Sequence, residues 1–200
     1  MVQSKSTNIQ GQKLEPPADL QVRRLKYADR MSIRRWMADI DLVRHTVVVP
    51  EPRYAVSIPY GQAAADRYLD GMLMAHDRWT FAIESGGTHI GNMGLKDVRL
   101  EERTAECFIE ICEPAYRRRG LAFHAMCRLL DFALLEKELT QIFLGVMEFN
   151  SAAIQLYQKL GFSFCGEYGK HWADEKYWQV RKMEITQDEW VFHRPSWTDA

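Results

Sequence analysis

At residues 116–122 the chain reads Tyr116-Arg117-Arg118-Arg119-Gly120-Leu121-Ala122, at the point where an apolar strand gives way to an amphipathic helix. Residues 105–112 before it alternate like a strand, and apolar residues recur at helical spacing after it. The first turn of a helix has free N–H groups and the positive end of the helix dipole, and a glycine lets a ligand approach the backbone. The stretch therefore predicts a pyrophosphate site. Taken alone it is better explained as a solvated basic turn, so the rest of the chain must decide.

The composition indicates one globular domain whose main partner is not nucleic acid. Two hundred residues with 46% hydrophobic content suffice for a sizeable core. The net charge of -1 and the pI of about 6.6 argue against a broadly basic face for phosphate backbones. The four cysteines form no Cys-x-x-Cys pair and have no histidine at metal-ligand spacing, so we expect reduced thiols and no metal site. No apolar run has the length of a membrane span, and we predict a cytoplasmic protein without a membrane partner.

The order of the apolar patterns predicts one domain over residues 20–190, between a flexible tail of residues 1–19 and a C-terminal tail of residues 191–200. Trp190, Phe192 and Trp197 make the end of the chain apolar, which favours a covered surface there. The predicted elements are a strand at 20–25, a helix after Asp29 that carries Ile40, an irregular loop at 45–59, a helix opened by Ser57 or Pro59, a hairpin at 78–95, a strand at 104–112, a helix to Lys137, a parallel strand at 140–147, a helix from Asn150 to Gly161, and an antiparallel pair at 162–165 and 177–185.

Four segments together resemble the GNAT superfamily of acyl-CoA-dependent N-acetyltransferases. They are residues 90–95 (Ile-Gly-Asn-Met-Gly-Leu), 105–106 (Ala-Glu), 116–122 and 150–162 (Asn-Ser-Ala-Ala-Ile-Gln-Leu-Tyr-Gln-Lys-Leu-Gly-Phe). The last segment is far more specific than the basic turn, and all four occur in the expected order. Within the superfamily the chain looks closest to the branch of ribosomal-protein N-terminal and small-amine acetyltransferases.

The resemblance implies a mixed α/β sheet of about seven strands, mostly antiparallel, with a central parallel pair splayed around the coenzyme A site and about four helices. Acetyl-CoA as cosubstrate would lie in that opening, with its pantetheine arm along strand backbone. Arg118 stands where many relatives have glycine, a departure that Gly120 should make tolerable. The predicted cofactor-binding residues lie at the strand end, in the basic turn and at the next helix: Ile111, Cys112, Arg117, Arg118, Arg119, Gly120, Leu121, Ala122, Phe123, Asn150 and Tyr157.

Acetyl transfer to nitrogen needs a group that takes a proton from the amine, whose pKa is about 10. Glu106 and Glu110 share one face of their strand if it is regular, and either could bind a cationic amine and relay its proton. Glu106 matches the Ala-Glu of the resemblance and is favoured, Glu110 is the alternative, and a solvated sheet face is as good an explanation for either one. Tyr157 matches the tyrosine that protonates the coenzyme A sulfur, and Asn150 matches a residue that contacts the pantetheine arm. Without the resemblance they would be a core aromatic and a helix cap.

The acceptor pocket in such folds is formed by the first helices, their connecting loop and the last hairpin. Aromatic side chains beside carboxylates suit a cationic or sugar-like amine, although each is more often a core residue. Many relatives carry an acidic residue after the hairpin tyrosine, where this chain has Trp178-Gln179, so the acceptor stays open. The predicted substrate-binding residues are Trp36, Tyr54, Tyr60, Glu106, His171 and Trp172.

The sequence thus predicts an enzyme that transfers an acetyl group from acetyl-CoA to the primary amine of a small molecule by direct attack in a ternary complex. An aminosugar, an aminoglycoside-like compound, a polyamine and an amino acid derivative are the candidate acceptors. Acetylation of a protein N-terminus and a non-catalytic acyl-CoA-binding module remain as alternatives. Homodimerisation through the last hairpin and the apolar tail is a further hypothesis. The acyl-chain preference and the pathway stay open.

Overall fold

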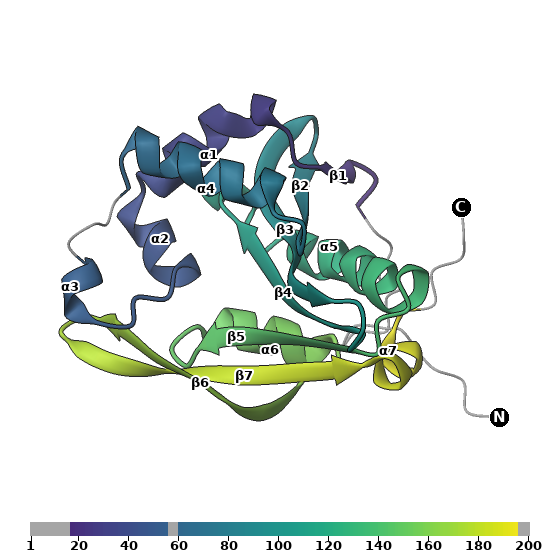
Figure 1. Cartoon of the computed structure of the whole chain (residues 1–200). Helices are drawn as coiled ribbons and strands as arrows, with labels where there is room; N and C mark the ends of the chain where they lie inside the picture. Colours follow the sequence, from purple (N-terminus) through teal and green to yellow (C-terminus); the bar gives the residue numbers. More distant parts are fainter. Residues whose placement is uncertain (1–16, 56–59, 196–200) are drawn as a thin grey trace.

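The alternating apolar segments form one seven-stranded sheet with helices on both faces (Figure 1). The computed structural model describes residues 17–55 and 60–195. The strands follow the order β1-β2-β3-β4-β5-β7-β6 and are antiparallel except for β4 and β5. Their bounds are β1 (Leu20–Arg24), β2 (Trp79–Ser85), β3 (Thr88–Arg99), β4 (Thr104–Ile111), β5 (Gln141–Met147), β6 (Ser163–Ala173) and β7 (Lys176–Thr186).

Helices cover the two faces unequally, and each face has its own core. Neighbouring residues of β2 point to opposite sides: Ile83 belongs to the larger core with α5 and α6, and Ala82 to the smaller core with α1, α2 and α4. The helices are α1 (Arg30–Met37), α2 (Ile40–Thr46), α3 (Pro52–Ala55), α4 (Gln62–Met74), α5 (Leu121–Leu130), α6 (Ser151–Lys159) and α7 (Gln187–His193), with the 3-10 turns η1 (Tyr27–Asp29) and η2 (Pro114–Tyr116) and the π-helical turn η3 (Asp131–Glu136).

The parallel strands β4 and β5 pair only at their first residues and then diverge. Pairing covers Thr104 with Gln141, Ala105 with Ile142 and Glu106 with Phe143. Beyond these positions the two strands separate, as Figure 1 shows at the centre of the sheet. The predicted mixed sheet with a splayed parallel pair is confirmed, and the splay leaves facing strand edges free for a ligand.

The segment between α1 and α4 differs most from the sequence prediction. The helix predicted to carry Ile40 is two helices, because the Asp39 carboxylate accepts from the N–H of Asp41 at 3.0 Å and starts α2 anew. The predicted loop of residues 45–59 contains the end of α2 and the short helix α3. The predicted helix start at Ser57 or Pro59 lies outside the described residues, and α4 begins at Gln62.

The number of helices, the contacts of Asp29 and the length of the last hairpin also differ from expectation. The prediction of about four helices is too low. Asp29 stands at the start of α1, but its carboxylate accepts from Lys26 N at 2.9 Å and from the Arg23 guanidinium at 2.7 Å instead of capping that helix. The last hairpin extends well beyond the predicted pair, to Ala173 in β6. Trp190 is fully buried, whereas Trp197 lies outside the described residues.

Candidate active site

A cavity of about 630 Å³ occupies the opening between β4 and β5. One wall consists of β4 residues Glu106 to Glu110, and another consists of Gly145 to Met147 of β5 with Asn150 and Tyr157 at α6. The remaining walls come from residues 45–50, from α4, from the residue before β2 and from β6. The site therefore brings together elements on both faces of the sheet, because the separation of β4 and β5 opens the sheet between its two faces.

The basic turn lies beyond the C-terminal end of β4, outside the lining of this cavity. Gly120 has a φ of 78°, a left-handed conformation that glycine adopts without a steric penalty, and α5 starts directly after it. In the first turn of α5 the N–H of Phe123 donates to the Gly120 carbonyl at 3.0 Å, whereas the N–H groups of Leu121 and Ala122 precede the hydrogen-bond ladder of the helix and can bind an anion. The turn thus has the backbone geometry of a phosphate site.

The three arginines of the turn differ in what they contact. Arg117 donates from Nε to the carbonyl oxygen of Ile111 at 2.9 Å and from a terminal nitrogen to that of Cys112 at 3.2 Å, so it ties the turn to the strand end. Arg118 has a φ of 58°, which explains why glycine suits this position. Arg119 lies over the ring of Tyr116 at 5.1 Å. Arg118 and Arg119 are exposed and available to a phosphate, whereas Arg117 is already engaged.

Residues on either side of the turn are largely packed. The side chains of Cys112, Leu121 and Phe123 are buried, and the N–H of Cys112 donates to Ile90 at 2.8 Å. The side chains of these predicted cofactor residues are therefore not exposed to a ligand. The N–H of Cys112 is also engaged and cannot bind the cofactor.

Tyr157 and Asn150 reach the cavity from α6. Tyr157 is 6% exposed, and its hydroxyl has no hydrogen-bond partner among the described residues. Burial, with a smaller effect of Cys107, raises the pKa of Tyr157 well above its usual value, so the hydroxyl keeps its proton at neutral pH. Asn150 caps α6 because its Oδ1 accepts from Ala153 N at 3.2 Å. The NH₂ group of Asn150 takes no part in this cap and can donate to a ligand. Both predicted residues thus lie where a ligand between the strands would meet them.

The two carboxylates of β4 face the cavity from the same side of the strand. The pairing of β3 with β4 is regular from Gly91 to Lys96, so residues 106, 108 and 110 share one face. Glu106 is engaged twice: it pairs with Lys96, directly opposite on β3, at 2.9 Å, and it accepts from the Tyr168 hydroxyl at 3.0 Å.

Glu110 has no cationic partner among the residues that the structure describes. Its carboxylate accepts from the Asn92 side chain at 2.9 Å, and burial raises its pKa while this hydrogen bond offsets part of the rise. The charge of Glu110 is in turn the main reason why the pKa of Tyr68, on α4, is raised. A carboxylate with a raised pKa beside a cavity has the properties of a general base near neutral pH.

Two buried polar side chains of β3, Asn92 and His89, form a hydrogen-bonded chain that orients the Glu110 carboxylate. Asn92 is fully buried, and His89 Nε2 lies 3.0 Å from its Oδ1 and 3.0 Å from the Gly91 carbonyl oxygen. Since both partners are acceptors, Nε2 carries the proton, and Asn92 must direct its NH₂ group toward Glu110. Burial lowers the pKa of His89, which Asp29 at 3.7 Å opposes. The sequence prediction missed this chain, although Asn92 lies within the segment 90–95 that carries the resemblance.

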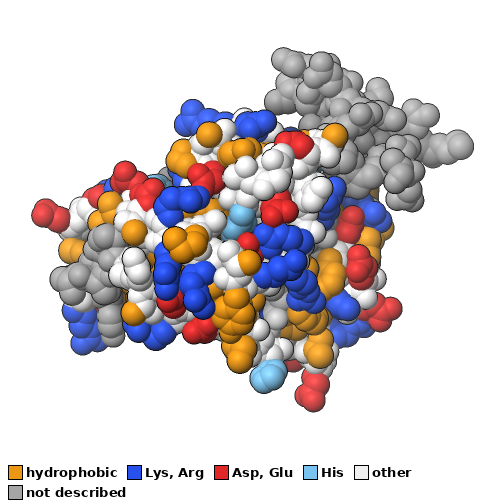
Figure 2. All heavy atoms as spheres, turned by 90° about the horizontal axis from the view of Figure 1, so that it is seen from above, with side chains coloured by type: hydrophobic (Ala, Val, Ile, Leu, Met, Phe, Trp, Pro, Cys, Tyr) orange, Lys and Arg blue, Asp and Glu red, His pale blue; other side chains and the backbone are white. Residues whose placement is uncertain are grey.

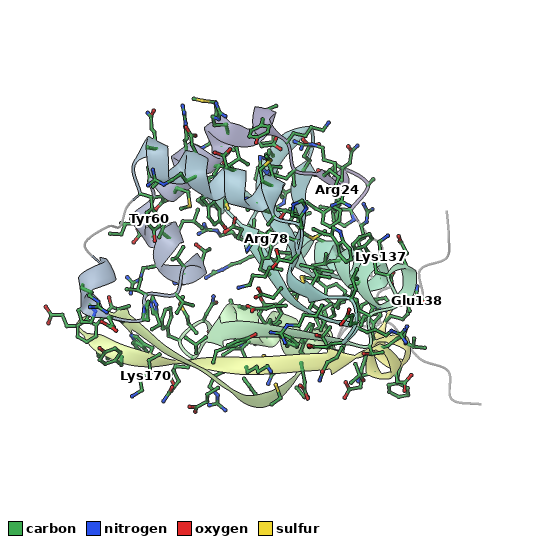
Figure 3. The ribbon with its side chains drawn as sticks, viewed as in Figure 1. Arg24, Tyr60, Arg78, Lys137, Glu138 and Lys170 are labelled. Atoms are coloured by element: carbon green, nitrogen blue, oxygen red, sulfur yellow. The ribbon has the colours of Figure 1, made fainter. Side chains whose placement is uncertain are left out.

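Trp36 and Tyr60 do not reach the cavity as predicted. Trp36 is 5% exposed, donates to Glu113 at 2.8 Å and packs edge-on against His89, so it is a core residue of α1. Tyr60, labelled in Figure 3, donates its N–H to Met37 at 2.9 Å and does not line the cavity. The side chain of Tyr54 lies outside the described residues.

His171 and Trp172 act on the cavity indirectly, through residues 47–50. His171 is 1% exposed and accepts from Val49 N at 2.9 Å, which assigns the proton of the neutral ring to Nε2. Burial lowers its pKa. The Trp172 N–H donates to the Val49 carbonyl at 2.6 Å, and its ring packs on Tyr177. Both residues thus fix a wall of the site and do not line it.

Besides the predicted Glu106, four residues that line the acceptor side were missed by the sequence prediction. They are Tyr68 on α4, Arg78 before β2, Lys96 on β3 and Tyr168 on β6. A signal existed for Lys96, since a hairpin with β4 places a residue of β3 opposite Glu106. Tyr68 and Tyr168 depend on long-range packing that periodicity does not specify.

Three features of the site fit a transferase with an extended, anionic cosubstrate. They are the splayed parallel pair, the helix start with free N–H groups beyond its open end, and a titratable group on each side of the opening. The family model described as the acetyltransferase (GNAT) domain matches residues 19–163, and the chain belongs to this family.

The relatives in this family include several polyamine acetyltransferases. The spermidine N(1)-acetyltransferase of Escherichia coli K12 is 36% identical over 87 residues, which cover 44% of this chain and 46% of the relative. An uncharacterized N-acetyltransferase, YokL, from the SPbeta prophage of Bacillus subtilis is 30% identical over 89 residues, covering 44% and 50%. The chain thus matches about half the length of these relatives.

Solved structures share the fold over nearly the whole chain. Spermidine N-acetyltransferase from Vibrio cholerae, in complex with coenzyme A and spermine, superposes with a TM-score of 0.75 over 88% of this chain and 99% of that one, at 22% identity. A dodecameric structure of the same enzyme gives 0.69 over 88% and 98%, also at 22% identity. Within the described residues, no helix is long and apolar enough to span a membrane and no group of side chains is suited to hold a metal ion.

Proposed function

We propose that this chain transfers an acetyl group from acetyl-CoA to the primary amine of a small molecule, by direct attack in a ternary complex. The observation that carries the proposal is the cavity at the splay, which has Tyr157 on the α6 side and Glu110 on the α4 side. Family membership supplies the reaction type. Three named spermidine acetyltransferases among the relatives and solved structures support a small amine as acceptor.

The residues present fit an extended, anionic thioester. The free edges of β4 and β5 beyond residue 106 can pair with an extended arm, and the start of α5 after Gly120 can bind its pyrophosphate. Arg118 and Arg119 would add charge there, and Asn150 would contact the arm. When bound, acetyl-CoA supplies the acetyl group as an activated thioester.

The chain itself supplies the proton transfers. Glu110 Oε accepts a proton from the ammonium group of the acceptor, which frees the nitrogen lone pair that attacks the thioester carbon. We favour Glu110 over Glu106 because Lys96 and Tyr168 already satisfy Glu106. Tyr157 donates its hydroxyl proton to the departing sulfur, for which its buried, protonated hydroxyl is suited. Asn92 holds the Glu110 carboxylate in place.

The test is release of free thiol from acetyl-CoA with a panel of primary amines: spermidine, glucosamine, kanamycin, amino acids and a peptide with a free N-terminus. Turnover with at least one small amine, lost in Tyr157→Phe, is the expected result. Turnover with the peptide alone would replace the small molecule by a protein N-terminus. Binding of acetyl-CoA without turnover of any amine would favour a binding module and contradict the proposal.

Self-association through the last hairpin is the second part of the proposal. β6 is an edge strand, and it and β7 expose Phe164 (42%) and Tyr177 (48%). Exposed apolar side chains on a free strand edge favour pairing with another chain. Light scattering coupled to size-exclusion chromatography tests this directly, and Phe164→Glu should shift an assembly toward the monomer.

A further inference from the structure

Two Lys or Arg side chains of the cavity lining, Arg78 and Lys170, form no ion pair with a described residue; Lys170 is exposed, whereas Arg78 is half-buried. Arg78 precedes β2 and lines the cavity, and Figure 3 shows it below α4, beside the opening between β4 and β5. Its Nε is shielded from solvent and has no hydrogen-bond partner, and it forms no ion pair with any described residue. Arginine stays protonated in proteins, so this charge is permanent.

Neither carboxylate of the cavity serves as the counterion of Arg78. Continuing the register of Trp79 with Leu95 places Arg78 beside Lys96, which already pairs with Glu106 at 2.9 Å. Glu110 accepts from the Asn92 side chain at 2.9 Å and forms no ion pair with Arg78. A shielded guanidinium Nε without a hydrogen-bond acceptor is unfavourable, and a ligand anion would satisfy it.

Tyr68 shows how the two ends of the acceptor side are arranged. Glu110 raises the pKa of Tyr68 and Arg78 lowers it, so both groups act on the same ring. The strand register separates Glu110, opposite Asn92, from Arg78, beside the Lys96–Glu106 ion pair, so the cavity has a carboxylate without a cation at one end and a guanidinium without an anion at the other. A molecule with an amine at one end and an anion at the other matches this pattern, whereas a polycation would place a positive group against Arg78.

We propose that the acceptor is a zwitterionic amine, and that Arg78 binds its anionic group, a carboxylate or a phosphonate, while Glu110 takes the amine. The inference rests on the proposed acetyl transfer and narrows its substrate class. It sets this chain apart from relatives whose names give spermidine as substrate. Arg78 is then a specificity-determining residue, since the bidentate guanidinium suits a planar carboxylate.

The experiment compares matched amines in the thiol-release assay with the full chain and acetyl-CoA. Each pair has the same chain length: β-alanine against propylamine, 4-aminobutyrate against butylamine and putrescine, and aminomethylphosphonate against methylamine, with spermidine alongside. The expected result is a kcat/KM for the anionic amines about 10- to 100-fold above that of their partners, as a hydrogen bond to a charged group allows. The phosphonate and carboxylate arms show which anion is preferred.

Arg78→Gln should remove that preference, mainly through a higher KM for the anionic amine, and Arg78→Lys should retain part of it. Arg24→Gln is the matched control, since Arg24 lies on β1 over the ring of Phe81 and does not line the cavity (Figure 3). Turnover led by spermidine or putrescine and unchanged in Arg78→Gln would overturn the inference and leave the proposed function intact. No turnover with any amine would overturn both.

Discussion

Glu106 and Glu110 lie four residues apart on the same strand face, and their partners assign them different roles. Because Glu110 lacks a cation and has a raised pKa, we expect Glu110→Gln to lower kcat about 100-fold or more, within the usual range for a general base. Glu106→Gln is the matched control and should cost much less activity, although it breaks the pair with Lys96. Steady-state kinetics with the best amine separate the two, and a larger loss in Glu106→Gln would reverse the assignment.

Thermal stability should separate a catalytic from a structural role of Glu110. A carboxyl group with a raised pKa in the folded state stabilises it only while protonated, below its ordinary pKa of about 4.3, and loses that contribution as pH rises through the folded-state pKa. Above the folded-state pKa the ionised carboxylate opposes folding, so at alkaline pH Glu110→Gln should melt at the same or a higher temperature than wild type. An inactive variant with a lower melting temperature would indicate a structural role instead.

Asn92 should tune the acid limb of the pH–rate profile. Its side chain lowers the pKa of Glu110 against the effect of burial, so Asn92→Ala should raise that pKa further. Activity requires ionised Glu110, and the acid limb should therefore move to higher pH. Tyr168→Phe removes a hydrogen bond from Glu106 only and should leave the limb in place. A profile of kcat/KM against pH that is identical in Asn92→Ala and wild type would contradict the assignment of Glu110 as base.

At the residue scale, the sequence predicted the residues that a local motif carries and missed those that tertiary packing places. Tyr157 and Asn150 lie at the cavity because one helix and its cap position them. Trp36 and His171 were chosen for their chemistry, but contacts within the fold hold them away from the cavity: Trp36 Nε1 donates to Glu113, and His171 Nδ1 accepts from the Val49 N–H. Arg78 gave no local signal, since its place depends on the register of three strands.

At the scale of elements, the turn between β4 and α5 places a strained residue, Arg118, next to the backbone N–H groups that can bind a phosphate. Arg118 is left-handed, which costs a non-glycine residue about 1–2 kcal/mol, while the larger unfolded-state freedom of glycine would offset about 0.4–1 kcal/mol. Arg118→Gly should therefore be neutral or slightly stabilising. Arg119→Gly, at a position without positive φ, should destabilise. Thermal melts of the two variants give the comparison, and equal losses would show that the turn is not strained at residue 118.

The strands were predicted better than the helices of the first half for a physical reason. Alternation and β-branched residues are local, and all seven strands appear where these patterns lie, including the parallel partner of β4. The segment of residues 45–50 depends on distant partners, since Val49 is held by the side chain of His171 and the N–H of Trp172. No periodicity within the segment encodes that contact.

At the scale of the whole molecule, the sheet consists of two parts that only three residue pairs join directly. Strands β1 to β4 form one part, and β5, β7 and β6 form the other. The buried residues of α5 and α6 in the larger core hold the parts together behind the opening. A ligand along the free edges of β4 and β5 would therefore add contacts where the sheet itself has few. On the face seen in Figure 2, basic and acidic side chains are interspersed, without a broad region of one charge.

Acetyl-CoA should accordingly stabilise the molecule, with the largest local effect at the splay. Binding only to the folded state contributes about 2.7 kcal/mol at 100 times Kd, which for a chain of this size corresponds to a rise in melting temperature of roughly 5–11 °C. Hydrogen exchange should slow most at residues 107–111 and 144–147, because an added strand satisfies their free N–H groups. Protection confined to the start of α5 would mean that only the phosphates are held there, and no shift at saturating acetyl-CoA would contradict the cofactor assignment itself.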